Sequence, residues 1–283
     1  MPQADETLNV FKEEFSGDSK MAYQQMGTKL RKTVQNQNNV VGKKAWFPKF
    51  GKVAEPQTLT GGGDLPIDDA EQDMVGVDLV DKGTGILRKN LDLLKTNTDQ
   101  KMLAAKSLAA AFGRLTDKQI ITAMAGTSLV VGDYTTGFTN AKCMEALEIA
   151  YDNEWPEDGN IFATLSNHAW NEFKTFSKVS SRDYAGEIYP WLKGRQAYIW
   201  NEVIWMPHSG LPLANGDDRD CFLYHKTAVA HASGSEMQID IDWIPMKRSW
   251  LIGGDMSQGA GLIDGGSDGG VIKIKCDDDT PIA

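Results

Sequence analysis

The feature that most constrains the fold is a pair of strand-like segments joined by a long polar connection. Residues 40–50 (VVGKKAWFPKF) and 74–80 (MVGVDLV) are rich in Val, Trp and Phe, which favour strands. The connection contains Gly61-Gly62-Gly63-Asp64, and its Gly, Pro and Asp content favours turns. A hairpin alone is barely stable in water, and this one offers few apolar residues for a second face. Residues 39–82 therefore predict a long hairpin that lies on another surface.

Charge is distributed unevenly around this hairpin. The chain has a net charge of -10, yet residues 1–53 hold nine basic and five acidic residues. Residues 54–82 hold eight acidic residues and one basic residue. A basic arm followed by an acidic loop suits subunits that dock on one another, whereas two solvated faces without a partner are the alternative. The overall negative charge disfavours a dedicated nucleic-acid binder.

A long helix is predicted at residues 97–126. Asn97, Thr98 and Asp99 are good N-cap residues, and Gly126 suits the C-terminal end. At 1.5 Å per residue the helix would be roughly 40 Å long. Apolar residues at helical spacing give it one packing face: Leu108, Ala111, Phe112 and Leu115.

The remaining segments predict a mixed α+β protein. Residues 1–38 are polar with sparse apolar anchors, which indicates an extended arm ordered mainly by neighbouring subunits. Two further helices are expected, one after Thr139-Asn140 and one capped by Ser166 or Asn167. Strands are predicted at 160–165, 197–206, 221–230, 237–244 and 271–276.

No residue pattern indicates a catalytic, cofactor or metal site. Neither GxxxxGK[ST] nor GxGxxG occurs. Ser257 fails the GxSxG pattern because Asp255 occupies the first glycine position, so a loop between strands is the simpler interpretation. Cys221 and His225 fall four apart on a predicted strand, too far apart for zinc ligands. The Gly-rich stretch 264–270 lacks the closing glutamate of a calcium loop and favours a turn.

Tryptophan and cysteine usage favours structural roles. The eight tryptophans could line a sugar or base site, but Trp170, Trp200, Trp243 and Trp250 fit core patterns, and aromatic residues are also enriched at interfaces. The three cysteines contain no CxxC pair, which fits buried free thiols in a reducing compartment. The N-terminus lacks signal-peptide features, and no apolar run reaches the ~20 residues of a membrane span. We expect a soluble protein made in a cytoplasm.

Three segments carry a resemblance to a known family. Met21–Val34 and Val41–Lys49 look like the start of one branch of phage capsid proteins, and Gly269–Ile274 looks like the closing strand of that branch. With the order of segments, the chain resembles tailed-phage major capsid proteins of the HK97-like fold. The resemblance implies an N-terminal arm (1–38), an E-loop (39–82), a P-domain (83–135, spine helix about 97–126), an A-domain (136–236) and return strands completing both domains (237–283).

By this resemblance the chain is not an enzyme. It would assemble through hexamers and pentamers into an icosahedral shell around double-stranded phage DNA, which the inner surface contacts non-specifically. Portal, scaffolding and decoration proteins are the implied partners, with no membrane. Its place would be the virion, after assembly in the host bacterial cytoplasm. The alternatives are an encapsulin-like compartment shell and an enzyme with an unrecognised site.

The hairpin supplies the candidate contact residues. An acidic loop can meet basic residues of an adjacent arm or spine helix, which sets register more than affinity. The hypothesis places these residues at the contact between subunits: Lys43, Lys44, Trp46, Asp64, Asp68, Asp69, Glu71 and Asp73.

Overall fold

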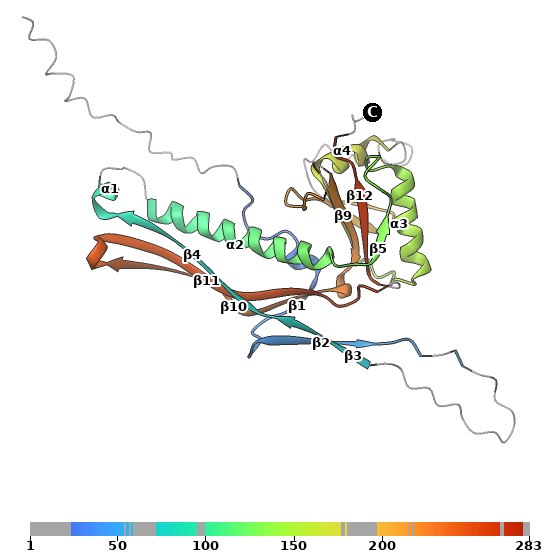
Figure 1. The fold of residues 1–283 in the computed structure, drawn as a ribbon, viewed down its shortest axis with the longest axis horizontal. Coiled ribbons are helices and arrows are strands. Elements are labelled where there is room, and N and C mark those ends of the chain that lie inside the picture. The colour runs from blue at the N-terminus through green and yellow to red at the C-terminus, as the bar shows by residue number, and fades with distance from the viewer. Residues whose placement is uncertain are drawn as a thin grey trace, which may run out of the picture.

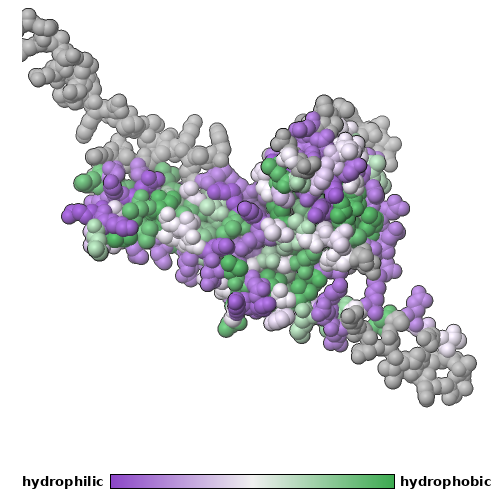
Figure 2. Space-filling model, viewed as in Figure 1, coloured by the Kyte–Doolittle hydropathy of each residue, from purple (hydrophilic) through white to green (hydrophobic). Residues whose placement is uncertain are grey.

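The computed structural model describes residues 24–53, 55–56, 58, 72–94, 100–176, 179, 197–214, 216, 218–266 and 269–279. These residues form an elongated plate, a hairpin beneath it and a rounded subdomain at one end (Figure 1). Scattered hydrophobic patches remain on the surface between hydrophilic residues (Figure 2). The fold is α+β, as predicted.

The plate is a four-stranded sheet with a long helix along one face. Its strand order is β1-β10-β11-β4, with β1 parallel to β10 and the other pairs antiparallel. The helix, α2, has 25 residues and is therefore about 37 Å long. The plate elements are β1 (Gln35–Gln37), β4 (Val80–Lys89), α1 (Asn90–Leu94), α2 (Gln100–Met124), β10 (Val229–Ile244) and β11 (Ser249–Leu262).

Close packing of α2 on the plate explains an error of the sequence interpretation. The stretch around Ser257 was expected to be a loop, but it lies inside β11. A Cβ atom on Gly254 would come within 2.8 Å of the Phe112 ring of α2. Glycine is thus required here by the approach of the helix, not by a turn.

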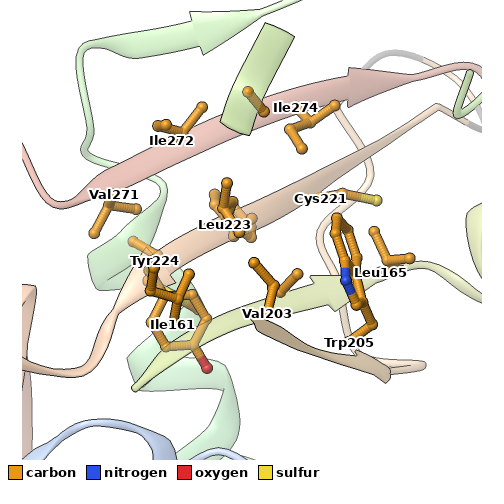
Figure 3. Close-up of a cluster of buried hydrophobic side chains, with 14 of the residues drawn as sticks. Ile161, Leu165, Val203, Trp205, Cys221, Leu223, Tyr224, Val271, Ile272 and Ile274 are labelled. Carbon is orange, nitrogen blue, oxygen red and sulfur yellow. The ribbon is translucent and has the colours of Figure 1, made fainter. Parts of the chain in front are cut away.

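The rounded subdomain is built on a six-stranded sheet of order β5-β12-β9-β6-β8-β7. Side chains from its central strands, including Ile161, Val203 and Leu223, form a continuous buried cluster (Figure 3). Its elements are β5 (Leu129–Val131), α3 (Asn140–Asp152), β6 (Ile161–Leu165), α4 (Asn167–Thr175), β7 (Tyr198–Trp200), β8 (Val203–Pro207), β9 (Arg219–His225) and β12 (Val271–Cys276).

Helix caps in this subdomain confirm the sequence prediction. The Thr139 side chain accepts a hydrogen bond from the Lys142 amide, and that of Ser166 accepts one from the Ala169 amide. Each cap satisfies a backbone donor that the first helical turn leaves free.

Two predicted strands are divided. Residues 197–206 form β7 and β8, because Asn201 and Glu202 take positive φ angles of 52° and 63° in a tight turn. Residues 221–230 are interrupted by a 3₁₀ turn at Lys226–Ala228, after which the chain leaves the subdomain sheet and enters the plate as β10. A short 3₁₀ turn between β9 and β10 therefore links the two bodies.

The expectations of buried free thiols and of no membrane span can be compared with the described residues. Cys143, Cys221 and Cys276 are buried and free. None of the helices in the described ranges is long and apolar enough to cross a membrane.

Candidate subunit-contact site

The predicted hairpin consists of β2 (Lys44–Phe50) and β3 (Gln72–Asp78), which pair antiparallel on the face of the plate opposite α2 (Figure 1). One face of the hairpin packs on the plate. Its Ala45, Phe47 and Val77 are at most 3% exposed and contact Ala230 and Ala232 of β10. A hairpin too weak to stand alone is thus stabilised by the sheet beneath it.

Small residues make the surface of the plate beneath the hairpin flat, and this surface is called the hairpin seat below. Ala230 pairs with Gly261, and Ala232 pairs with Gly259. A Cβ atom on Gly259 would lie 2.1 Å from the Asp78 carbonyl oxygen, and one on Gly261 would lie 2.7 Å from the Val77 side chain. The backbone of β3 can approach β11 this closely only because these positions are glycine.

The outer face of the hairpin is apolar as well, contrary to our expectation of few apolar residues for a second face. Trp46 is 55% exposed, Phe50 68% and Met74 65%, and Pro48 is also exposed. The Trp46 ring lies over Gly76, where a Cβ atom would come within 3.0 Å of the ring. The hairpin therefore has two apolar faces, one packed on its own chain and one open.

The structure describes four of the eight predicted contact residues. The Lys44 ammonium lies 3.3 Å from the Asp78 carboxylate, its cross-strand partner, and 5.9 Å from the centre of the Trp46 ring. Lys43 is exposed, and its carbonyl oxygen accepts a hydrogen bond from the Leu79 amide. Asp73 is exposed and accepts a hydrogen bond from the Met74 amide at 2.7 Å.

The other four predicted contact residues lie outside the described residues. They belong to the acidic connection between β2 and β3: Asp64, Asp68, Asp69 and Glu71. The role of all eight at a subunit contact stays a prediction.

Two ion pairs that sequence reasoning missed fix the direction of the hairpin. Lys49 lies 2.8 Å from Asp264, and Lys52 lies 2.6 Å from Glu154. A hydrogen bond from Lys52 lowers the pKa of Glu154. Both pairs are partly or largely exposed to solvent, which screens their charges, so each stabilises the subunit only weakly. They span a recess of about 650 Å³ between the hairpin and the subdomain.

The chain before the hairpin is held by a buried carboxylate on α2. Asp117, 1% exposed, accepts hydrogen bonds from the Lys29 and Leu30 amides at 3.1 Å and lies 3.1 Å from His208 Nε2. Burial alone would raise the pKa of Asp117, but hydrogen bonds from His208, Lys29 and Leu30 lower it below its ordinary value. Asp117 therefore stays ionised and joins the N-terminal segment, α2 and the subdomain.

The last part of the predicted arm is held by its own chain, whereas residues 1–23 lie outside the described residues, so ordering of the arm by neighbouring subunits stays a prediction. Residues 24–37 contact their own chain through Asp117, through Thr33 on the Tyr224 hydroxyl at 2.6 Å, and through the pairing of β1 with β10. This segment crosses α2 at Gly113. A Cβ atom there would lie 2.6 Å from Gly27.

The part of the chain that the structure describes contains no metal-binding cluster. No group of three or more His, Cys, Asp and Glu side chains there could hold a metal ion. Cys221 accepts a hydrogen bond from the Ser166 amide. His225 contacts Asp158 and Thr227 at 3.0 and 2.8 Å. Both side chains have structural partners.

A plate backed by a long helix, with a hairpin on its other face and a separate rounded subdomain, is the HK97-like capsid fold. Solved structures share it over nearly the whole chain. The head structure of Helicobacter pylori bacteriophage KHP40 matches at 14% identity, covering 99% of this chain and 100% of that one, with a TM-score of 0.75. The capsid of cyanophage P-SCSP1u (94% and 93% covered) and Mycobacterium phage Che8 (94% and 97%) each match at 16% identity and a TM-score of 0.72.

A family model described as phage capsid protein matches residues 8–278, and the chain belongs to this family. It is a phage major capsid protein, and its family gives it a structural role in the virion. No curated protein sequence matches the chain significantly.

Proposed function

We propose that this capsid protein assembles through hexamers and pentamers into an icosahedral shell around double-stranded phage DNA, with residues 39–82 as the loop that joins neighbouring subunits. The open apolar face of the hairpin carries this proposal. Trp46, Phe50 and Met74 stay more than half exposed in a single chain. Aromatic side chains and Met are enriched at protein interfaces, so a second copy is the natural occupant of this face.

The charges support the same arrangement. Lys43 and the acidic residues Asp64, Asp68, Asp69, Glu71 and Asp73 would set the register of the contact, while Lys44 and Trp46 would form its centre. With this role for the hairpin, the proposed domain boundaries are arm 1–38, intersubunit loop 39–82, P-domain 83–135, A-domain 136–236 and return strands 237–283. Portal, scaffolding and decoration proteins would join the shell, which forms in the host bacterial cytoplasm.

Deleting residues 54–71 tests this role. Phe50 and Gln72 are cross-strand partners, so a short Gly-Ser turn can close the shortened hairpin without disturbing its seat. We expect a folded subunit with wild-type thermal stability that forms no closed shells under negative-stain electron microscopy. Normal shells from the deletion would refute the role of the loop.

A length-matched variant separates charge from length. Changing Asp64, Asp68, Asp69 and Glu71 to Asn or Gln keeps the loop but removes four charges. We expect this variant to assemble less efficiently, with a weaker dependence on salt than the wild type. Unchanged assembly and salt dependence would remove the acidic residues from the proposed contact.

A further inference from the structure

The exposed side of α2 is basic in a protein that is acidic overall. The helix contains four basic residues and one acidic residue, and that residue, Asp117, is buried. Lys106, Arg114 and Lys118 are exposed and separated by multiples of four residues, so they follow one row along the helix. From Lys106 to Lys118 this row spans about 18 Å.

The N-terminal segment adds to this basic surface. Residues 24–34 contain Lys29, Arg31 and Lys32 and no acidic residue. The segment crosses α2 at Gly113 and Asp117, which lie on the side of the helix opposite Leu108, a residue that packs on the sheet. The N-terminal segment therefore lies on the side of α2 that points away from the sheet.

Most of these cations have no carboxylate partner. Within the described ranges, Lys29, Lys32, Lys106, Arg114 and Lys118 form no ion pair, whereas Arg31 pairs with Glu236. Like charges left unneutralised on one surface destabilise a chain slightly and suit an anionic partner.

The opposite face of the plate has the reverse charge. Ile239 and Gly254 meet α2, so strand alternation turns Asp240, Asp242 and Asp255 to the other side. All three are exposed. Asp81, which pairs with Ser257, and Lys89, which pairs with Ser249, share that side. The plate thus presents a basic helix face and an acidic sheet face.

A recess lies beside the basic row. It has a volume of about 470 Å³, with Arg114 and Lys118 on one wall and His208, Ser209 and Gly210 on another. The Arg114 guanidinium donates a hydrogen bond to the Gln24 side chain at 2.9 Å, which holds it at the rim. Arginine, lysine and serine side chains all bind phosphate, and Arg114, Lys118 and Ser209 line this one recess.

We propose that this basic surface, Lys29, Lys32, Lys106, Arg114 and Lys118, faces the shell interior and binds backbone phosphates of the enclosed duplex DNA. The proposal rests on the function proposed above and names the side of the subunit that contacts DNA. Over 18 Å a duplex carries about ten phosphates. The three-residue row of α2 can therefore engage phosphates without reading sequence.

The test measures binding of unassembled full-length subunits to a fluorescent 30-bp duplex by anisotropy, between 50 and 200 mM salt. The row variant is K106Q/R114Q/K118Q. A matched control, K89Q/K174Q/K247Q, removes three cations elsewhere. If three phosphate contacts are lost, wild-type affinity should fall about 40-fold more than row-variant affinity over this salt range. The control should behave like the wild type.

Further variants keep the outcome clear. The variant K106R/R114K/K118R preserves the positive charge at all three positions. It should keep wild-type DNA binding even if the neutral variant folds poorly. Equal salt dependence of the row variant and its control would overturn the proposal. Binding to polyglutamate but not to duplex DNA would also overturn it and indicate an acidic protein partner. Shell formation is scored separately by electron microscopy, so normal shells with no DNA binding would refute this inference while leaving the proposed function intact.

Discussion

Adjacent residues on β2 should affect different properties of the protein, because they lie on opposite faces of the hairpin. A Trp side chain buries up to about 250 Å², and Trp46 is 55% exposed. Covering its exposed part, about 140 Å², would stabilise a subunit contact by about 3 kcal/mol. Trp46→Ala should therefore raise the protein concentration needed for assembly on the order of 100-fold. Phe47, 3% exposed, contributes to the subunit itself, and Phe47→Ala should cost about 3–5 kcal/mol of unfolding free energy.

Light scattering against protein concentration measures assembly, and urea unfolding of unassembled subunits measures stability. Trp46→Ala should change the unfolding free energy by about 1 kcal/mol or less, since more than half of the Trp46 side chain is exposed in the single chain. Trp46→Phe, which keeps most of the apolar area, should assemble within several-fold of wild type. Assembly of Trp46→Ala at the wild-type concentration, with the subunit fully stable, would refute the reasoning.

Three further predictions follow from buried groups. Asp117→Ala should cost about 3–5 kcal/mol in urea unfolding. Because the folded pKa of Asp117 is lowered, the wild-type advantage should persist above about pH 4 and shrink as pH falls through that pKa; an equal gap at pH 3 would contradict this. Gly259→Ala should unseat the hairpin and reduce assembly, whereas Gly266→Ala, with open space around its Cβ position, should be neutral in both assays. All three cysteines are buried, and burial raises the pKa of Cys143 to about 12. Because burial blocks access to the thiols, thiol reagents should label none of the three until the protein is unfolded; fast labelling of native protein would show otherwise.

Local signals in the sequence predicted the elements that local chemistry determines. The caps at Thr139 and Ser166, the long helix and the alternating strand at 237–244 all follow from patterns within a few residues. The hairpin and its need for a supporting surface were also predictable, because its composition was insufficient for independent stability.

Features that depend on distant residues could not be predicted in this way. The glycines of β11 suggested a loop, and only the approach of Phe112 and Val77 from elsewhere in the chain explains them. The partners of Lys49 and Lys52 lie more than 100 residues away. Strand alternation in β2 could have revealed the open face, because Lys44, Trp46, Pro48 and Phe50 share one side.

The seat of the hairpin also has a consequence for synthesis. Val77 packs beside Gly261, and β1 pairs with β10 across nearly 200 residues. A ribosome adding about 5–20 residues per second needs roughly 10–40 s to travel from one to the other. Until then the nascent chain has no surface on which to dock its hairpin or complete its longest sheet. Competence to join a shell should therefore arise only when the last strands emerge, so that incomplete chains are excluded from the growing particle.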